Sequence, residues 1–175
     1  GSIKWVWEQG CGVFGAEGEL LALEGLVIDI SVRKRAETTL ARLAAIVESS
    51  QDAIISIDQA QVIVSWNAGA ERLYGYTAAE VVGRHNRFLA PPALQQERER
   101  NWKTINQGGP VAPRETVRLA KDGRRIDVLV TLSPIRDSAG NIIGVSAIHR
   151  DLSEHRQAEA TRAHLAAIVE SSQDT

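Results

Sequence analysis

The sequence predicts an α+β domain in which helices cover one face of an antiparallel sheet. Two short runs typical of strands come early, at 53–58 and 62–66, and three more come late, at 115–121, 126–132 and 142–150. Helical segments fill the interval between the two groups. Strands grouped on either side of helices favour an antiparallel sheet, because a parallel sheet requires strands and helices to alternate.

Composition fits a globular chain and argues against several functional classes. Of 175 residues, 43% are hydrophobic and 24% charged, and the net charge of −2 argues against nucleic-acid binding through bulk positive charge. No apolar run reaches the length of a membrane span, so none is expected within the sequence. A single cysteine, Cys11, excludes an internal disulfide and a cysteine zinc cluster, so no metal site is expected. This cysteine usage suits a cytoplasmic protein.

One segment of the chain occurs twice. Residues 43–52 read LAAIVESSQD, and residues 165–174 repeat the same ten letters. An identical decapeptide in register indicates tandem duplication of a domain-sized unit rather than a short solenoid repeat. We therefore expect the last strands of a preceding unit in 1–32, a linker helix in 33–52, one complete domain in 40–152, and an exit helix with the start of a third unit in 153–175. The missing Met and the leading Gly-Ser indicate a piece of a longer chain.

The linker helix carries an apolar stripe. Its 4, 3 and 4 residue spacing is typical of a coiled-coil seam, formed by Ala36, Leu40, Leu43 and Val47. Fewer than two heptads also fit an ordinary amphipathic helix packed on its own domain, so both interpretations stay open. The exit helix repeats the stripe as Ala158, Arg162, Leu165 and Val169, with a charge at the second position.

Capping and breaking residues set the helices of the central domain. Asn67 is a candidate N-cap for a helix over 68–73, and Thr77 with Glu80 forms a capping-box pattern for a second short helix. Pro91-Pro92 opens a longer helix that extends to Asn106, because proline is tolerated in a first turn.

The late strands show the two-residue alternation of half-buried strands. In the first of them Val117 and Leu119 share one face. In the next, Val128 and Val130 belong to an apolar face that alternates with Asp127 and an unexpectedly apolar Leu129. Leu129 is therefore a candidate for packing against a helix on the outer face of the sheet.

Four segments together resemble the PAS family of sensor domains. They are IVESSQDAIISID (46–58), VSWNAGAERLYGYTAAEVVGR (64–84), RLAKDGRRIDVLVTLSPIRDSAGNIIG (118–144) and HRDLSEHRQAE (149–159). The resemblance implies a five-stranded antiparallel sheet with helices on one face, flanked by amphipathic linker helices, and it makes residues 3–32 look like the last two strands of another PAS copy. It also implies further PAS copies in series, which lie upstream of a histidine kinase or a cyclic-dinucleotide enzyme or within a chemoreceptor.

The resemblance allows two cofactors, haem and flavin, to be tested against the residues that would bind them. Haem-binding members use a His on the long helix, and residues 92–106 contain none, with Arg98 near the corresponding place. Flavin photoreceptors use a Cys where this chain has Asn86, and an amide cannot form the thioether adduct. Arg84 and Arg87 could contact a flavin phosphate, although solvated arginines on short helices are strongly favoured as the explanation.

The chain is therefore expected to be a sensory and dimerisation module without catalytic residues, and whether it holds a cofactor stays open, with haem disfavoured and a covalent flavin adduct excluded. Its homodimer contact is expected along Ala36, Leu40, Leu43, Val47 and Leu129. The expected cavity wall, which could equally be a plain core, consists of Trp102, Val117, Leu119, Val128, Val130 and Val145. Two alternatives remain: a sensor for a small molecule or a non-covalent flavin, and the regulatory part of a transcription regulator.

Overall fold

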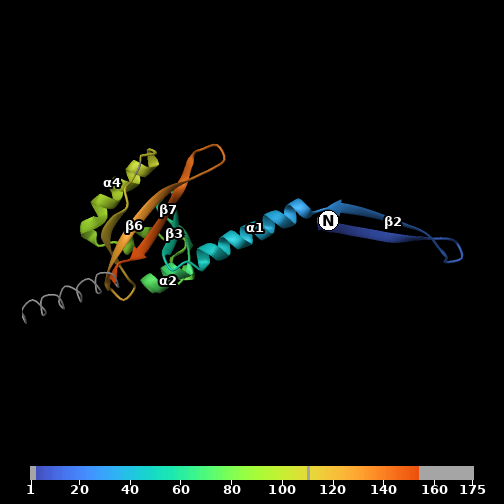
Figure 1. The fold of residues 1–175 in the computed structure, drawn as a ribbon, viewed down its shortest axis with the longest axis horizontal. Coiled ribbons are helices and arrows are strands. Elements are labelled where there is room, and N and C mark those ends of the chain that lie inside the picture. Colours follow the sequence, from blue (N-terminus) through green and yellow to red (C-terminus); the bar gives the residue numbers. More distant parts are fainter. Residues whose placement is uncertain (1–2, 110, 154–175) are drawn as a thin grey trace, which may run out of the picture. The chain divides into compact units, whose positions relative to one another are not determined.

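The computed structural model describes residues 3–109 and 111–153, and these fall into two units divided between Ile46 and Val47. The first unit is a strand hairpin with most of a helix, and the second contains a five-stranded sheet and the remaining helices (Figure 1). In these described ranges, no helix combines the length and the apolar character that crossing a bilayer requires.

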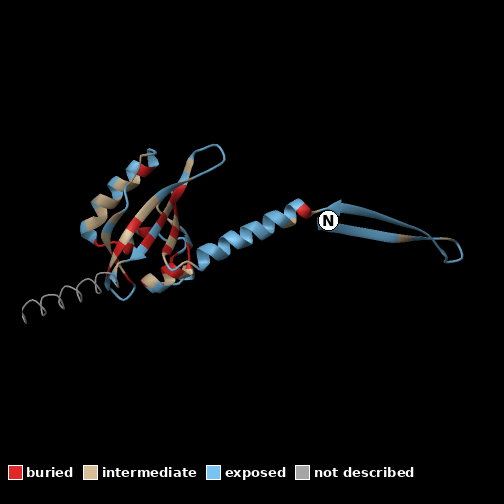
Figure 2. Ribbon diagram, viewed as in Figure 1, coloured by how far each residue is buried: buried red, intermediate tan, exposed pale blue. Residues whose placement is uncertain are grey.

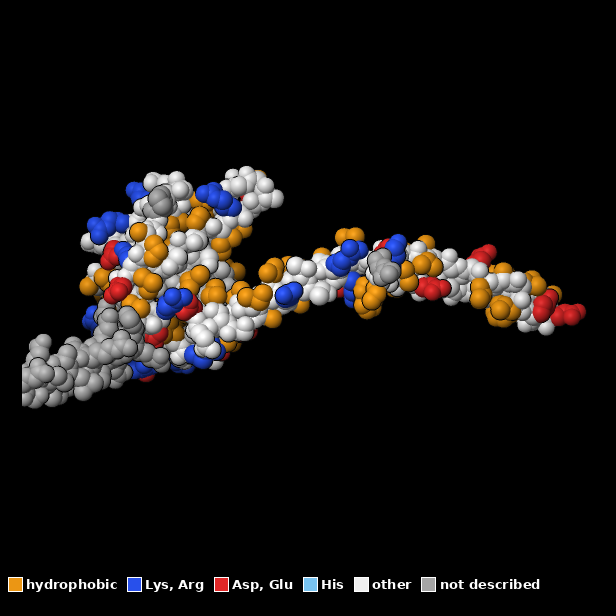
Figure 3. Space-filling model, in the orientation of Figure 1, with side chains coloured by type: hydrophobic (Ala, Val, Ile, Leu, Met, Phe, Trp, Pro, Cys, Tyr) orange, Lys and Arg blue, Asp and Glu red, His pale blue; other side chains and the backbone are white. Residues whose placement is uncertain are grey.

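The first unit begins with an antiparallel hairpin of β1 (Val6–Phe14) and β2 (Leu20–Asp29). Most large apolar side chains on both faces of the hairpin are exposed, among them Trp7, Phe14, Leu20, Leu21, Leu23 and Leu26. Orange side chains accordingly line this hairpin in Figure 3. A two-stranded ribbon cannot bury its own apolar surface, so these side chains need a cover that the ribbon does not supply.

Helix α1 (Ser31–Glu48) follows directly and is anchored to the hairpin at its first residue. Ser31 is 3% exposed, and its hydroxyl accepts a hydrogen bond of 2.8 Å from the Trp5 backbone N–H. The rest of the helix is almost entirely exposed (Figure 2), including Leu40 at 66% and Leu43 at 55%. The apolar stripe predicted from the sequence is therefore not buried against the hairpin of its own unit.

The second unit is built on five antiparallel strands in the order β4-β3-β7-β6-β5. The strands are β3 (Ala53–Asp58), β4 (Ile63–Trp66), β5 (Arg114–Leu119), β6 (Arg125–Arg136) and β7 (Ile142–Asp151). The first strand of this unit pairs with the last, from Ala53 opposite His149 to Asp58 opposite Gly144. The predicted fold class, a five-stranded antiparallel sheet with helices on one face, is confirmed.

Five short helical segments connect β4 to β5: α2 (Ala68–Tyr74), α3 (Ala78–Val81), the 3-10 turns η1 (Asn86–Leu89) and η2 (Pro92–Leu94), and α4 (Gln95–Asn106). Asn67 caps α2 as predicted, because its Oδ1 accepts from the backbone N–H of Ala70 at 2.9 Å. The same Oδ1 accepts from Ile54 of β3 at 2.8 Å. This buried amide therefore fixes α2 to the sheet as well as starting the helix.

The core lies between the inner face of the sheet and these helices, where Figure 2 shows the red residues gathered. On β6, Val128 and Val130 are 0% and 2% exposed, as the alternation predicts. The prediction that Val117 and Leu119 of β5 face the inside of the domain is wrong. Arg114, Thr116 and Arg118 lie opposite inward-facing residues of β6, so Val117 and Leu119 lie on the outer face.

Candidate functional site

A cavity of about 50 Å³ lies between the inner face of the sheet and the segments η1 and α4. By the volume that one water occupies in such cavities, roughly 10–15 Å³, it has room for about four waters. Apolar side chains form much of its wall: Ile55, Ile57, Leu89, Trp102, Leu132, Val145 and Ala147. Polar side chains form the remainder: Gln61, Asn86, Arg98, Asn101, Arg114, Arg118 and His149.

Arg118 is the most deeply buried charge in this wall, with 6% of its surface exposed. Strand β5 directs it inward, opposite Ile126 of β6. Its Nη1 donates to the Val117 carbonyl at 3.0 Å and, more weakly, to the Thr116 hydroxyl at 3.5 Å. Burial lowers the pKa of this guanidinium, which nevertheless stays charged near neutral pH because arginine starts from so high a value.

Arg98 enters the cavity from α4, on the opposite wall. Its Nη1 donates to Gln95 Oε1 at 2.8 Å, and its Nη2 donates to the Oδ1 of Asn86. Burial, and then the positive charge of Arg118, lower its pKa to about 10. Glu99 acts in the opposite direction but is exposed, so Arg98 is held in the wall mainly by neutral amide oxygens.

Arg114, the third arginine of the wall, differs because it has a counter-charge. It forms an ion pair with Glu97 of α4. Within the part of the chain that the structure describes, Arg98 and Arg118 take part in no ion pair. The cavity wall therefore carries two positive charges without a paired carboxylate.

His149 lines the cavity and is hydrogen-bonded to Tyr74, which lies outside the lining. The Tyr74 hydroxyl lies 2.5 Å from His149 Nδ1, and the two rings meet edge-on. Burial, followed by the charges of Arg118 and Arg98, lowers the pKa of His149 to about 3. The ring is therefore neutral near pH 7, and it adds hydrogen-bonding capacity to the wall without adding charge.

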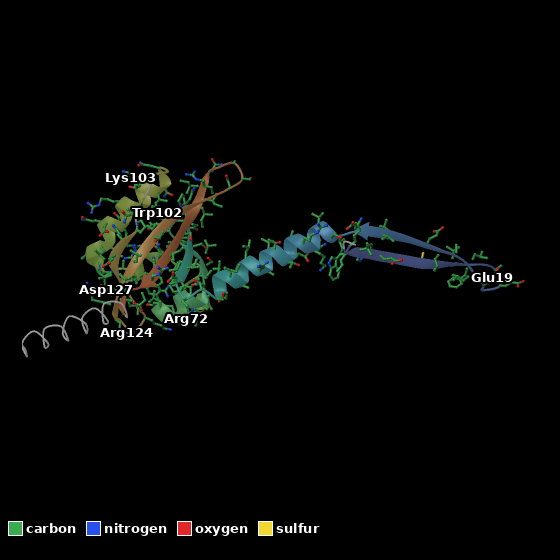
Figure 4. The ribbon with its side chains drawn as sticks, in the orientation of Figure 1. Glu19, Arg72, Trp102, Lys103, Arg124 and Asp127 are labelled. Atoms are coloured by element: carbon green, nitrogen blue, oxygen red, sulfur yellow. The ribbon has the colours of Figure 1, made fainter. Side chains whose placement is uncertain are left out.

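The predicted site residues are divided by the structure. Trp102, labelled on α4 in Figure 4, and Val145 lie in the cavity wall, whereas the neighbouring Lys103 is exposed. Val128 and Val130 belong to the packed core and are not part of the wall. Val117 and Leu119, placed on the wrong face, contribute nothing to it.

The residues expected at a dimer contact are partly described. Ala36, Leu40 and Leu43 are exposed on α1, Val47 is 40% exposed, and Leu129 is partly buried on the outer face of β6. The second stripe, Ala158, Arg162, Leu165 and Val169, lies outside the described residues.

Sequence reasoning missed the arginines as a pair, together with Asn86 and His149 as wall residues. Arg114, Thr116 and Arg118 alternate with Glu115 and Val117, so an inward polar face on β5 was available as a signal. It was overlooked because the apolar face of a strand was taken to be the inward one. Asn86, considered only as a replacement for a reactive cysteine, is 6% exposed and touches Arg98.

The comparisons with known proteins agree on one family. The family described as PAS fold matches residues 41–152. Two-component system protein A of Emericella nidulans is 35% identical over 122 residues, which cover 69% of this chain and 17% of that protein. Sensor protein FixL of Bradyrhizobium diazoefficiens is 26% identical over 168 residues, which cover 90% of this chain and 32% of that protein. The chain thus spans less than a third of the length of the curated relatives it matches.

Solved structures agree on the fold. The PAS domain of a Colwellia psychrerythraea protein superposes with a TM-score of 0.60 at 27% identity, covering 66% of this chain and 98% of that one. A structure described as an RNA-binding Light-Oxygen-Voltage receptor gives 0.61 at 25% identity, covering 94% of this chain and 44% of that one.

Proposed function

Because the chain belongs to the PAS family, we propose that it is a sensory and dimerisation segment of a multi-PAS signalling protein. The observation that carries this proposal is the decapeptide repeated at 43–52 and 165–174, whose first copy spans the end of α1 and the connection to β3. Both curated relatives are described as signalling proteins, one a two-component system protein and one a sensor. Their descriptions support a sensory role for the matched segment.

The proposed signal path runs through the helices that join successive units. Helix α1 ends at Glu48, and β3 of the next unit begins at Ala53, so only a short connection separates them. A stiff helix can transmit a rotation or a shift of register, whereas a flexible linker would lose either. The catalytic output, a histidine kinase or a cyclic-dinucleotide enzyme, would then be carried by another part of the protein.

The proposed dimer is a parallel pair of α1 helices packed along Leu40 and Leu43. These side chains are more than half exposed, and leucines at such spacing form seams between parallel helices. Leu129 on the outer face of β6 would add to the contact. A charge introduced at the seam should separate the two chains, because it would be buried without a counter-charge.

Sedimentation velocity over a concentration series tests this dimer. We expect the unmodified chain to associate reversibly, Leu40→Glu and Leu43→Glu to sediment as monomers, and Arg162→Glu to have a smaller effect. Thr38→Glu is the matched control, since it places the same charge on the same helix away from the stripe. A monomer at every concentration, or a dimer indifferent to Leu40→Glu, would remove this part of the proposal.

The cavity lined by Trp102 favours a second candidate function, the sensing of a small molecule. A non-covalently bound flavin would give the purified protein blue absorbance, which makes that version of the candidate simple to test. The small volume of the cavity favours a much smaller ligand.

A further inference from the structure

We propose that the cavity of the second unit binds a small carboxylate anion between the guanidinium groups of Arg118 and Arg98. This inference rests on the proposed sensory function and names the chemical class of its ligand. It starts from one feature of the structure: two arginines reach the same cavity from opposite walls, one from β5 and one from α4.

Charge is the first argument. Burying a cation is costly unless an anion compensates it. Arg114, the partly buried arginine of the same wall, shows the usual solution, because it pairs with Glu97. Arg118 is 6% exposed, yet among the described residues it has no such partner. An anionic ligand would supply the missing charge.

Hydrogen-bonding capacity is the second argument. A guanidinium has five N–H donors. The hydrogen bonds that Arg118 makes to described residues both come from Nη1, which leaves Nε and Nη2 available where the side chain borders the cavity. A carboxylate accepts two parallel N–H bonds from such a fork. Asn101, from α4, also lines the cavity and could donate to the same anion.

The size and lining of the cavity decide which anion fits. About 50 Å³ accommodates roughly four or five non-hydrogen atoms if each replaces about one water. Aliphatic side chains of β3 and β7, with Trp102 from α4, form the wall beside the arginines. An anion with a short apolar tail suits both parts of the wall, whereas phosphate would place oxygens against the aliphatic side. The ligand is therefore a short monocarboxylate of the size of acetate or propionate.

The test uses the whole chain and follows the indole N–H resonance of Trp102 by NMR. Acetate, propionate and butyrate are titrated separately at constant ionic strength, with chloride and phosphate as comparison anions. We expect acetate or propionate to shift the Trp102 resonance saturably and to raise the melting temperature. Chloride and phosphate should do neither, and butyrate should bind more weakly because its longer tail exceeds the cavity.

Two variants and a control locate the site. Arg118→Met keeps the apolar stem without the charge, and Arg98→Gln keeps hydrogen-bonding capacity without the charge. Each should weaken carboxylate binding at least tenfold. Arg118→Met should also melt higher than the unmodified chain in the absence of ligand, because it removes a buried charge that lacks a counter-ion. Arg125→Gln, an exposed arginine on the outer face of β6, should change neither property.

Several outcomes would overturn the inference. They are no saturable shift with any carboxylate, an equal response to chloride and phosphate, and full binding by folded Arg118→Met. Sedimentation of the same samples separates this inference from the proposed function. An intact Leu40-dependent dimer without carboxylate binding would remove only the ligand, whereas carboxylate binding by a monomer would remove only the dimer.

Discussion

His149 is held inside the second unit with its Nδ1 2.5 Å from the Tyr74 hydroxyl, and Arg118 and Arg98 are the charged groups that face it. These surroundings keep the ring neutral, and its pKa of about 3 lies well below the 6.5 of an exposed histidine. The unfolded chain therefore binds one proton more than the folded chain between these two pKa values. Stability that is complete above pH 6.5 must then decline as the pH falls toward 3.

We predict that the free energy of unfolding declines by up to about 1.4 kcal/mol per pH unit below pH 6.5 because of this one group. Urea denaturation at pH 7, 6 and 5 measures the decline. His149→Gln should be less stable at pH 7, since Tyr74 loses its partner, but should show a flatter dependence on pH. His85, whose pKa burial also lowers, provides the comparison through His85→Gln. If His149→Gln kept the full slope, another group would be responsible.

Only part of the role of Asn67 could be predicted from the sequence. The pattern of an amide before a helix predicted the cap, which the structure contains. It could not predict that Nδ2 also donates to the Val47 carbonyl at 2.8 Å and to the Asp52 carbonyl at 3.1 Å. Those bonds join segments 15 and 20 residues away in sequence, and only the folded chain brings them within reach.

At the scale of elements, β6 has one buried face and one face that is at least partly accessible. We predict that Val128→Asp lowers the free energy of unfolding by about 3 kcal/mol or more, because it places a carboxylate without a partner where the exposed fraction is 0%. Arg125→Asp is the matched control, since it introduces the same carboxylate on the same strand at an exposed position. Denaturant titration of both compares them, and equal losses would contradict the assigned facing.

Side chains of strand β5 also alternate between the two faces of the sheet, but here the apolar ones face outward. Its inward positions are Arg114, Thr116 and Arg118, because the strand borders the cavity as well as the core. The sequence pattern alone gives the two sets of alternating positions but not which set faces inward. Pairing with β6 decided it, since Arg118 lies opposite the buried Ile126.

At the scale of the whole molecule, the two units differ in how well they bury their apolar surface. The second unit has a core in which Tyr74, Ile55 and Val128 are almost fully buried. The hairpin of the first unit leaves Leu23 78% exposed and Phe14 64% exposed. Its strands therefore form no core of their own, and exposed apolar surface of this kind is typical of interaction sites.

We predict that a chain starting at Ser31 keeps the melting temperature of the full chain, because the cooperative core lies after residue 47. The shortened chain should also scatter less light at high concentration, since the exposed apolar residues of β1 and β2 are gone. Calorimetry and static light scattering measure these two properties. A drop of several degrees in the melting temperature would mean that the hairpin stabilises the second unit.

The fold class, the family, the cap at Asn67 and the two alternating faces of β6 could be predicted from the sequence, because these depend on short motifs or on spacings of a few residues. Only the tertiary structure decided that β3 lies beside β7 and that Arg98 and Arg118 meet at one cavity. The two arginines are 20 positions apart on different elements, and local periodicity contains no information about which distant elements pack together. Hydrophobic patterning assigns charged residues to the surface, so it leads away from a site whose chemistry consists of buried charge.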